Sequence, residues 1–210
     1  MAFRAFVETH LPPAPSRVLE VGCGRGALAL AVSRLGYEVD AIDPDAPAGA
    51  IFRAVSLEEF SDPGPFDAVV ANLSLHHIPD LGGALAKIRR LLRPEGRLIV
   101  NELAWDRLDE PTAHWYLEQL ATTDPGAPSS VERCLDKWAA DHDGMHTSAA
   151  MRTELDQHFE ERFFVWTPQL NRELGKAIDD RAERALIEAG EIQATGFRYV
   201  GDLPAAPGGG

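Results

Sequence analysis

The sequence has few of the features expected of a secreted, disulfide-bonded or membrane-spanning protein. Only Cys23 and Cys134 are cysteines among its 210 residues. They lie far apart without metal-ligand spacing, so a disulfide framework is not expected. Residues 1–10 lack the apolar core of a signal peptide, and no run approaches the ~20 apolar residues that span a bilayer. We therefore expect a cytoplasmic protein that does not bind membranes.

Basic residues are also scarce. The chain has 20 Lys and Arg against 33 Asp and Glu, a formal net charge of −13. This charge repels phosphate backbones, so nucleic acid is not an expected partner. A neutral or cationic small molecule suits it better, and we expect a monomer or a homodimer. The length supports a single domain, residues 1–210, with a full core and a modest insertion.

Short apolar runs alternate with helix-like segments, which is typical of a parallel α/β sheet. About eight residues separate the second strand from the third, too few for a crossover helix. Turns are expected at Pro63–Pro65 and Arg93–Gly96. The predicted strands are Arg17–Val21, Glu38–Ile42, Ile51–Val55, Phe66–Ala71, Arg97–Ala104, Arg162–Thr167 and Ala194–Val200. The predicted helices between them are Ala27–Leu35, Leu81–Leu92 and Glu173–Ala189.

The alternation stops between about 106 and 158. This segment carries helix-like stretches at Pro111–Leu120, Ser130–Ala140 and Ser148–Phe159. We predict that it forms a helical cap over the end of the sheet, inserted after the fifth strand. The Gly-rich tail, 205–210, is expected to be flexible.

The stretch from Val18 to Gly26 runs from a strand into a helix through three glycines. Glycine lets the backbone turn sharply and approach a ligand closely. Gly22, Gly24 and Ala27 also fit a dinucleotide fingerprint, with Asp43 where a ribose-binding acid is expected. Glu20 favours another ligand, because a carboxylate beside the loop repels pyrophosphate and attracts an amino or sulfonium cation. S-adenosylmethionine carries both cations and no phosphate.

Four ordered segments resemble class I (Rossmann-like) S-adenosylmethionine-dependent methyltransferases. They are Glu20–Gly26, Val39–Asp43, Phe66–Ile78 and Leu91–Val100, and Gly196–Val200 is similar to the family's last strand. The resemblance covers most of residues 15–104 and returns near the C-terminus. It implies a seven-stranded, mostly parallel sheet with the last strand antiparallel and helices on both faces.

The resemblance also implies a cofactor site for S-adenosylmethionine. Gly22, Cys23 and Gly24 would line its methionine part, with Glu20 beneath the amino group. Asp43 would accept hydrogen bonds from both ribose hydroxyls. Pro44 would pack near the adenine.

Further along the chain, the resemblance places Ser56 and Leu57 against the adenine through their backbone, and Asn72 and Leu73 at the closed end of the site. The chain departs from the pattern of many relatives, which carry an Asp near positions 55–57. Two alternatives follow: Ser56 replaces that adenine contact, or the contact is lost.

Methyl transfer mainly requires that the reactants be held in line without water. A general base is needed only if the accepting atom must lose a proton. His76 and His77 follow the fourth strand, where the loop faces the acceptor in similar enzymes. Each can instead pack against or cap the loop. Of the two we predict His77, which lies nearer the following helix.

The predicted cap supplies further candidates. His142 and His146 are four residues apart, but Gly144 interrupts the helix that a metal pair would need. We therefore expect no metal site, and we name His146 as a third candidate base. Trp105, Asp106 and His142 are predicted substrate contacts, although core packing also explains the aromatic residues. Glu102, near Asp106, is expected to help orient a cationic acceptor.

These inferences predict metal-independent transfer of a methyl group to O or N of a small metabolite, with C as a third alternative. Two other functions stay open: a non-catalytic partner or regulatory protein that binds S-adenosylmethionine, and an NAD-dependent oxidoreductase. A rarer possibility is that the sulfonium assists a non-methylating reaction. The sequence does not identify the acceptor.

Overall fold

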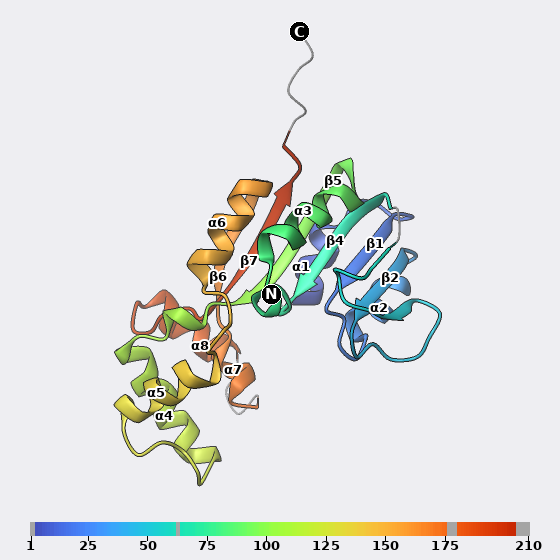
Figure 1. Cartoon of the computed structure of the whole chain (residues 1–210). Helices are drawn as coiled ribbons and strands as arrows, with labels where there is room; N and C mark the ends of the chain where they lie inside the picture. The colour runs from blue at the N-terminus through green and yellow to red at the C-terminus, as the bar shows by residue number, and fades with distance from the viewer. Residues whose placement is uncertain (1–2, 62–63, 176–179, 205–210) are drawn as a thin grey trace. The chain divides into compact units, whose positions relative to one another are not determined.

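The computed structural model describes residues 3–61, 64–175 and 180–204 (Figure 1). Pro63 of the predicted turn at Pro63–Pro65 and the whole predicted tail, 205–210, lie outside these residues. So do residues 176–179 of the predicted helix Glu173–Ala189.

The strands form one seven-stranded sheet in the order β3-β2-β1-β4-β5-β7-β6. β1 pairs in parallel with β2 and β4, β2 with β3, and β4 with β5, whereas the last strands are antiparallel. The predicted Rossmann-like sheet is confirmed. The strands are β1 Arg17–Val21, β2 Glu38–Asp43, β3 Phe52–Ala54, β4 Phe66–Asn72, β5 Leu92–Leu103, β6 Glu160–Thr167 and β7 Gly196–Asp202.

Helix boundaries follow capping side chains. Asp80, Asp109 and Ser130 each accept a hydrogen bond from the backbone N–H three residues later, at the starts of α3, α4 and α5. The α-helices are α1 Phe3–His10, α2 Ala27–Ser33, α3 Leu81–Leu91, α4 Glu110–Thr123, α5 Val131–Asp141, α6 Ser148–His158, α7 Leu170–Glu173 and α8 Asp180–Glu188. Two 3₁₀ turns, η1 Leu75–His77 and η2 Trp105–Arg107, were not predicted, and neither was α1.

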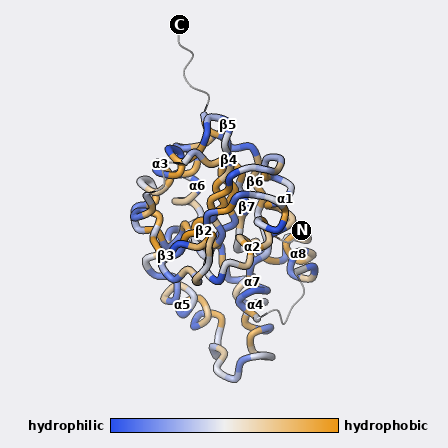
Figure 2. The backbone as a smooth tube through the Cα atoms, turned by 90° about the vertical axis from the view of Figure 1, so that its right-hand side faces the viewer, coloured by the Kyte–Doolittle hydropathy of each residue, from blue (hydrophilic) through white to orange (hydrophobic). Residues whose placement is uncertain are grey.

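Helices lie on both faces of strands β1, β2, β4 and β5 (Figures 1 and 2). On one face, Phe6 and Val7 of α1 and Val32 of α2 join a buried cluster with Val18 and Val70 of the sheet. Helix α3 covers the opposite face and buries Leu85 and Ile88 completely. Strands buried on both faces read as continuous apolar runs, which is why β1 and β4 were visible in the sequence.

Most predicted elements differ from the observed ones by at most three residues at an end, but two predictions are wrong by more than that. β5 begins at Leu92, not Arg97, because the predicted turn at Arg93–Gly96 is a bulge inside the strand: Phe66 pairs with Leu92 and Ala68 already pairs with Arg97. The predicted helix Glu173–Ala189 is not continuous, because α7 ends at Glu173 and Gly175 adopts a left-handed φ of 63°.

Backbone contacts divide the chain into two compact units. Unit 1 comprises residues 1–102, 150–164 and 198–210, and unit 2 comprises residues 103–149 and 165–197. Unit 2 includes α7 and α8 in addition to α4 and α5, whereas most of α6 belongs to unit 1. Within the described residues, no helix has the length and apolar character needed to cross a membrane.

Candidate functional site

The glycine loop between β1 and α2 has a backbone that only glycine adopts without strain. Gly22, Gly24 and Gly26 have φ values of 73°, 50° and 76°. The left-handed region costs other residues roughly 1–2 kcal/mol each. The loop is anchored to the end of β2, because the N–H groups of Gly22 and Cys23 both donate to the carbonyl of Ile42, at 2.9 and 3.0 Å.

The three glycines differ in the space around them. A Cβ at Gly22 would lie 2.3 Å from Cβ of Ser74, and one at Gly26 would lie 2.3 Å from the ring of Phe52. A Cβ at Gly24 would meet nothing within 4 Å. Gly22 and Gly26 are therefore required by packing as well as by backbone conformation, whereas the loop at Gly24 is open to a ligand.

Asp43, at the end of β2, holds this loop in place. Its Oδ2 accepts from the N–H of Gly24 at 2.9 Å, and its Oδ1 accepts from the N–H of Asp45 at 2.9 Å. The carboxylate is half-buried. Each oxygen has a second lone pair with which it can accept a hydroxyl.

Glu20 is buried beneath the same loop, with only 4% of its surface exposed. Burial raises the pKa of its carboxyl to about 8, a backbone hydrogen bond from Ala29 lowers it, and the Asp43 charge raises it further. Its Oε2 has no hydrogen-bond partner. A buried, unpartnered carboxyl oxygen next to a glycine cradle fits a cationic group. Glu20 and Asp43 thus offer hydrogen-bond acceptors of the kind that an amino group and ribose hydroxyls require.

Cys23 contributes its backbone to the loop, whereas its thiol is buried. Burial and the nearby carboxyl groups of Glu20 and Asp43 raise the pKa of this thiol to about 12. A thiol with such a pKa is protonated at neutral pH and is a poor nucleophile.

The residues predicted near the adenine are arranged less specifically. Pro44 is exposed and Leu57 is buried. The hydroxyl of Ser56 accepts from the N–H of Glu59 at 3.3 Å, which closes a local turn. The Ser56 side chain is thus used within its own turn, and an adenine contact through its backbone stays a prediction.

β4 ends at Asn72, and Leu73 follows it in a constrained backbone conformation. The side-chain carbonyl of Asn72 accepts from the amide of Asn101 at 3.1 Å. Leu73 has a φ of 54° and its N–H donates to the carbonyl of Asn101 at 2.8 Å. A non-glycine residue in the left-handed region is uncommon, and such strain gathers at functional sites.

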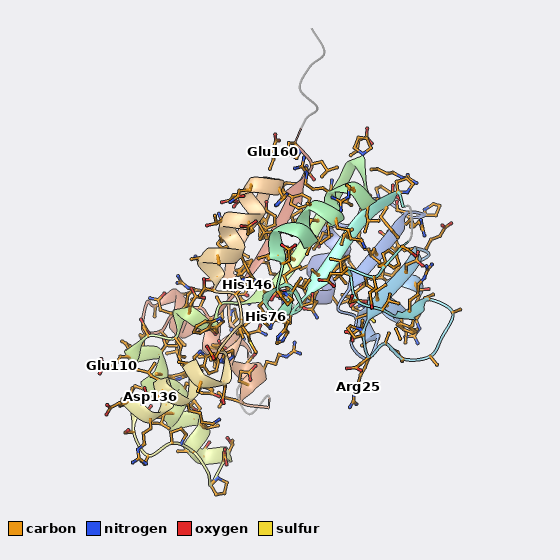
Figure 3. All side chains as sticks on the ribbon, in the orientation of Figure 1. Arg25, His76, Glu110, Asp136, His146 and Glu160 are labelled. Carbon is orange, nitrogen blue, oxygen red and sulfur yellow. The ribbon has the colours of Figure 1, made fainter. Side chains whose placement is uncertain are left out.

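The loop after β4 is fixed by Glu102 of β5, a residue that is fully buried. Glu102 Oε1 accepts from the N–H groups of Ser74 and Leu75 at 2.8 and 2.7 Å. Its Oε2 is paired with Nδ1 of His76, which is itself 4% exposed and is labelled in Figure 3. The expectation that Glu102 orients a cationic acceptor is wrong, because both of its oxygens are occupied by this loop.

His77 differs from its neighbour. Its side chain is exposed, and its ring lies 4.1 Å from the ring of His76. The preference for His77 rested on its position before the next helix. No sequence pattern distinguishes two adjacent histidines, since the distinguishing partner, Glu102, lies 26 residues away.

In unit 2, the structure brings the predicted substrate residues together. The indole of Trp105 donates to the carbonyl of His146 at 3.1 Å and lies parallel to the ring of His142. Nδ1 of His142 pairs with the carbonyl of Trp138 at 2.7 Å. Asp106 accepts from the backbone N–H of Ser148 at 2.7 Å. These contacts organise unit 2 internally, and a role in binding an acceptor stays a prediction.

His142 and His146 do not share a helix, because α5 ends at Asp141 and Gly144 has a φ of 79°. In the part of the chain that the structure describes, no three His, Cys, Asp or Glu side chains are grouped as metal ligands.

A family model described as a methyltransferase domain matches residues 2–162. The chain belongs to this family. It is 34% identical over 113 residues to the ubiquinone biosynthesis O-methyltransferase of Xanthomonas axonopodis pv. citri (strain 306), covering 47% of each chain. The chain thus spans about half the length of the curated relatives it matches.

Solved methyltransferase structures share the fold. A putative S-adenosylmethionine-dependent methyltransferase from Listeria monocytogenes has a TM-score of 0.61 at 16% identity, covering 95% of this chain and 97% of that one. The 1,6-didemethyltoxoflavin-N1-methyltransferase of Burkholderia thailandensis, solved with its acceptor and S-adenosylhomocysteine, has a TM-score of 0.56 at 19% identity, covering 95% and 76%. These identities support the Rossmann-like fold alone.

Proposed function

We propose that the protein transfers a methyl group from S-adenosylmethionine to a small-molecule acceptor, without a metal ion, in the cytoplasm. The observation that carries this proposal is the pairing of an open glycine cradle with the buried, unpartnered Oε2 of Glu20. A cation beside Glu20 would favour the ionised form of its carboxyl and be stabilised by it, whereas a pyrophosphate would gain no such partner and would face the carboxylate of Asp43. Family membership supports the same ligand.

The chain's own residues bind and orient in this mechanism. Gly22, Cys23 and Gly24 would hold the methionine part, with Glu20 beneath its amino group and Asp43 at the ribose. The sulfonium supplies a methyl carbon that is already activated, so positioning and exclusion of water account for much of the rate.

The same proposal gives roles to the remaining predicted residues. Pro44, Ser56 and Leu57 would border the adenine, and Asn72 and Leu73 would close the site. His76, His77 and His146 are the candidate bases. In unit 2, Trp105, Asp106 and His142 are the proposed acceptor contacts.

Calorimetric titration with S-adenosylhomocysteine tests the cofactor site directly. Asp43→Ala should weaken binding roughly ten- to hundredfold, since it removes charge-assisted hydrogen bonds to the ribose worth about 1.5–3 kcal/mol. Asp45→Ala is the matched control, because Asp45 is an exposed neighbouring carboxylate. Equal affinities of the two variants would contradict the ribose contact.

A second measurement separates the alternatives. The protein is incubated with methyl-labelled S-adenosylmethionine and a metabolite extract, and labelled product is sought. Tight binding with no product from any extract would favour a non-catalytic binding protein. Quenching of tryptophan fluorescence by NADH, with none by S-adenosylhomocysteine, would favour an oxidoreductase.

A further inference from the structure

Glu102 and His76 form a buried carboxylate–imidazole pair that methyl transfer in general does not require. Glu102 is 0% exposed and His76 is 4% exposed. Two backbone N–H groups already donate to Glu102 Oε1, and such donors stabilise the ionised carboxylate. An anion is therefore held against Nδ1 of His76.

This pairing fixes the proton on the imidazole. A carboxylate only accepts hydrogen bonds, so Nδ1 of His76 must be the protonated nitrogen of the neutral ring. Nε2 then carries the lone pair and is the nitrogen that can take up a proton. The carboxylate also stabilises the imidazolium that forms, which is how a buried acid supports a histidine base in hydrolases.

Residues 73–76, the segment that ends at His76, also contact the glycine loop. The hydroxyl of Ser74, two residues before His76, donates to the carbonyl of Val21 at 3.0 Å. Ser74 also fills the space that a Cβ at Gly22 would need. Leu73, which begins the segment, is held in the left-handed region. This rigid connection fixes His76 relative to the proposed cofactor site.

We propose that His76 takes the proton of an acceptor hydroxyl and that Glu102 is the positioning residue for His76. The acceptor is then an alcohol or a phenol, and the product is a methyl ether. This inference rests on the proposed function and narrows it from O, N or C to oxygen. A hydroxyl oxygen becomes a strong nucleophile as its proton leaves, which is what a base at Nε2 supplies, whereas a neutral amine already has a free lone pair and needs no base before attack. The identity of the methylated atom in the product tests the choice of oxygen over nitrogen and carbon.

The step balances without a further reactant. The acceptor O–H bond breaks as its proton passes to His76 Nε2, and the oxygen forms a bond to the methyl carbon. The carbon–sulfur bond breaks, with its electron pair staying on sulfur. Glu102 remains ionised throughout, and the imidazolium later releases its proton to solvent.

The tautomer is measured on the intact protein without an acceptor. Long-range ¹H–¹⁵N spectra of ¹⁵N-histidine protein, assigned through a His76→Gln variant, should show His76 protonated at Nδ1 at neutral pH. In Glu102→Gln, an amide can donate to Nδ1, so the Nε2–H tautomer should appear. Wild-type protein with a neutral Nε2–H ring would overturn the proposal, whatever the stability of the variants.

Activity is read with methyl-¹³C S-adenosylmethionine and a metabolite extract. The ¹³C shift of the product methyl group distinguishes a methyl ether from a methylamine or a new C-methyl group. His76→Gln should lower turnover by about 10²–10⁴-fold. Glu102→Gln should lower kcat at least about tenfold, with little change in KM and an altered lower limb of the pH profile. His114→Ala, an exposed histidine of α4, is the control.

The outcomes separate this inference from the one on which it rests. An O-methyl product that depends on both residues, with unchanged S-adenosylhomocysteine affinity, supports the dyad. An N- or C-methyl product, or full turnover by His76→Gln, overturns the dyad and leaves methyl transfer standing. Absence of cofactor binding, or of any labelled product, overturns both.

Discussion

At the scale of single residues, Glu20 shows how burial and ligand charge act together. Its carboxyl pKa, raised to about 8 mainly by burial, means that it is largely protonated at pH 7. A cationic ligand beside it favours the ionised form and lowers that pKa again. Binding should therefore release a proton, and affinity for S-adenosylhomocysteine should rise with pH until the pH exceeds about 8.

The proton is counted by calorimetry at pH 7 in buffers that differ in ionisation enthalpy. We expect close to one proton released per ligand bound by the wild-type protein. Glu20→Gln should release almost none, and Glu38→Gln, an exposed residue of β2, should behave as wild type. Buffer-independent enthalpies for the wild-type protein would contradict a neutral, buried Glu20.

The glycines of the loop allow backbone strain to be separated from steric conflict. Gly24→Ala should cost roughly 1–2 kcal/mol of unfolding free energy, from the left-handed conformation alone. Gly22→Ala should cost more, because its Cβ would also lie 2.3 Å from that of Ser74. Urea unfolding of both variants, and of each in a Ser74→Gly background, measures the difference. Equal losses, unchanged by Ser74→Gly, would show that packing against Ser74 is unimportant.

At the scale of secondary structure, the sequence predicted what local patterns encode. β1 was placed at its observed bounds, since its apolar run ends at the glycine loop. α1 was missed because its eight residues contain only two, Phe6 and Val7, that are buried in the core. The bulge in β5 was predicted as a turn, because Pro94 and Gly96 give the same signal in either setting.

For the candidate site as well, the sequence predicted the residues that belong to local motifs and not the pairing of residues that are distant in the chain. Glu20 and the glycine loop form a contiguous motif, and Asp43 stands at the end of the next strand. The motif and the strand end can both be recognised from the sequence alone. The pairing of Glu102 with His76 cannot, because it depends on β5 lying beside β4. A single sequence gives no measure of which distant carboxylate reaches which histidine.

Another buried carboxylate, Glu183 of α8, determines the start of α7. Its Oε1 accepts from the N–H groups of Gln169 and Leu170 at 2.8 and 3.0 Å, and its Oε2 accepts from that of Asn171 at 2.8 Å. Glu183→Ala should lower the unfolding free energy by about 3 kcal/mol or more, because buried N–H groups lose a charged acceptor.

Urea denaturation and amide hydrogen exchange check this expectation. Exchange at residues 169–171 should accelerate in Glu183→Ala, and Glu183→Gln, which keeps an acceptor oxygen, should lose less. Glu188→Ala removes an exposed carboxylate from the same helix and should stay within about 0.5 kcal/mol of wild type. Wild-type protection at 169–171 in Glu183→Ala would show that α7 does not depend on this cap.

At the scale of the whole molecule, the net charge of −13 produces a negative field that favours cations. S-adenosylmethionine carries one more positive charge than S-adenosylhomocysteine, on its sulfonium, and is otherwise similar. The field therefore acts differently on two ligands that, under the proposed function, would make the same contacts with the glycine loop. We expect salt to weaken the binding of S-adenosylmethionine more than that of S-adenosylhomocysteine.

The two affinities are compared from about 0.01 M to about 1 M salt, where the Debye length shrinks from about 30 Å to about 3 Å. The ratio of the dissociation constants should move against S-adenosylmethionine as salt rises, and it should level off once distant carboxylates are screened. Whatever preference persists at high salt belongs to close groups such as Glu20, so Glu20→Gln should reduce it while leaving the salt slope intact. A ratio independent of salt would mean that the close carboxyl groups alone select the cation, and that the acidic surface contributes nothing to cofactor choice.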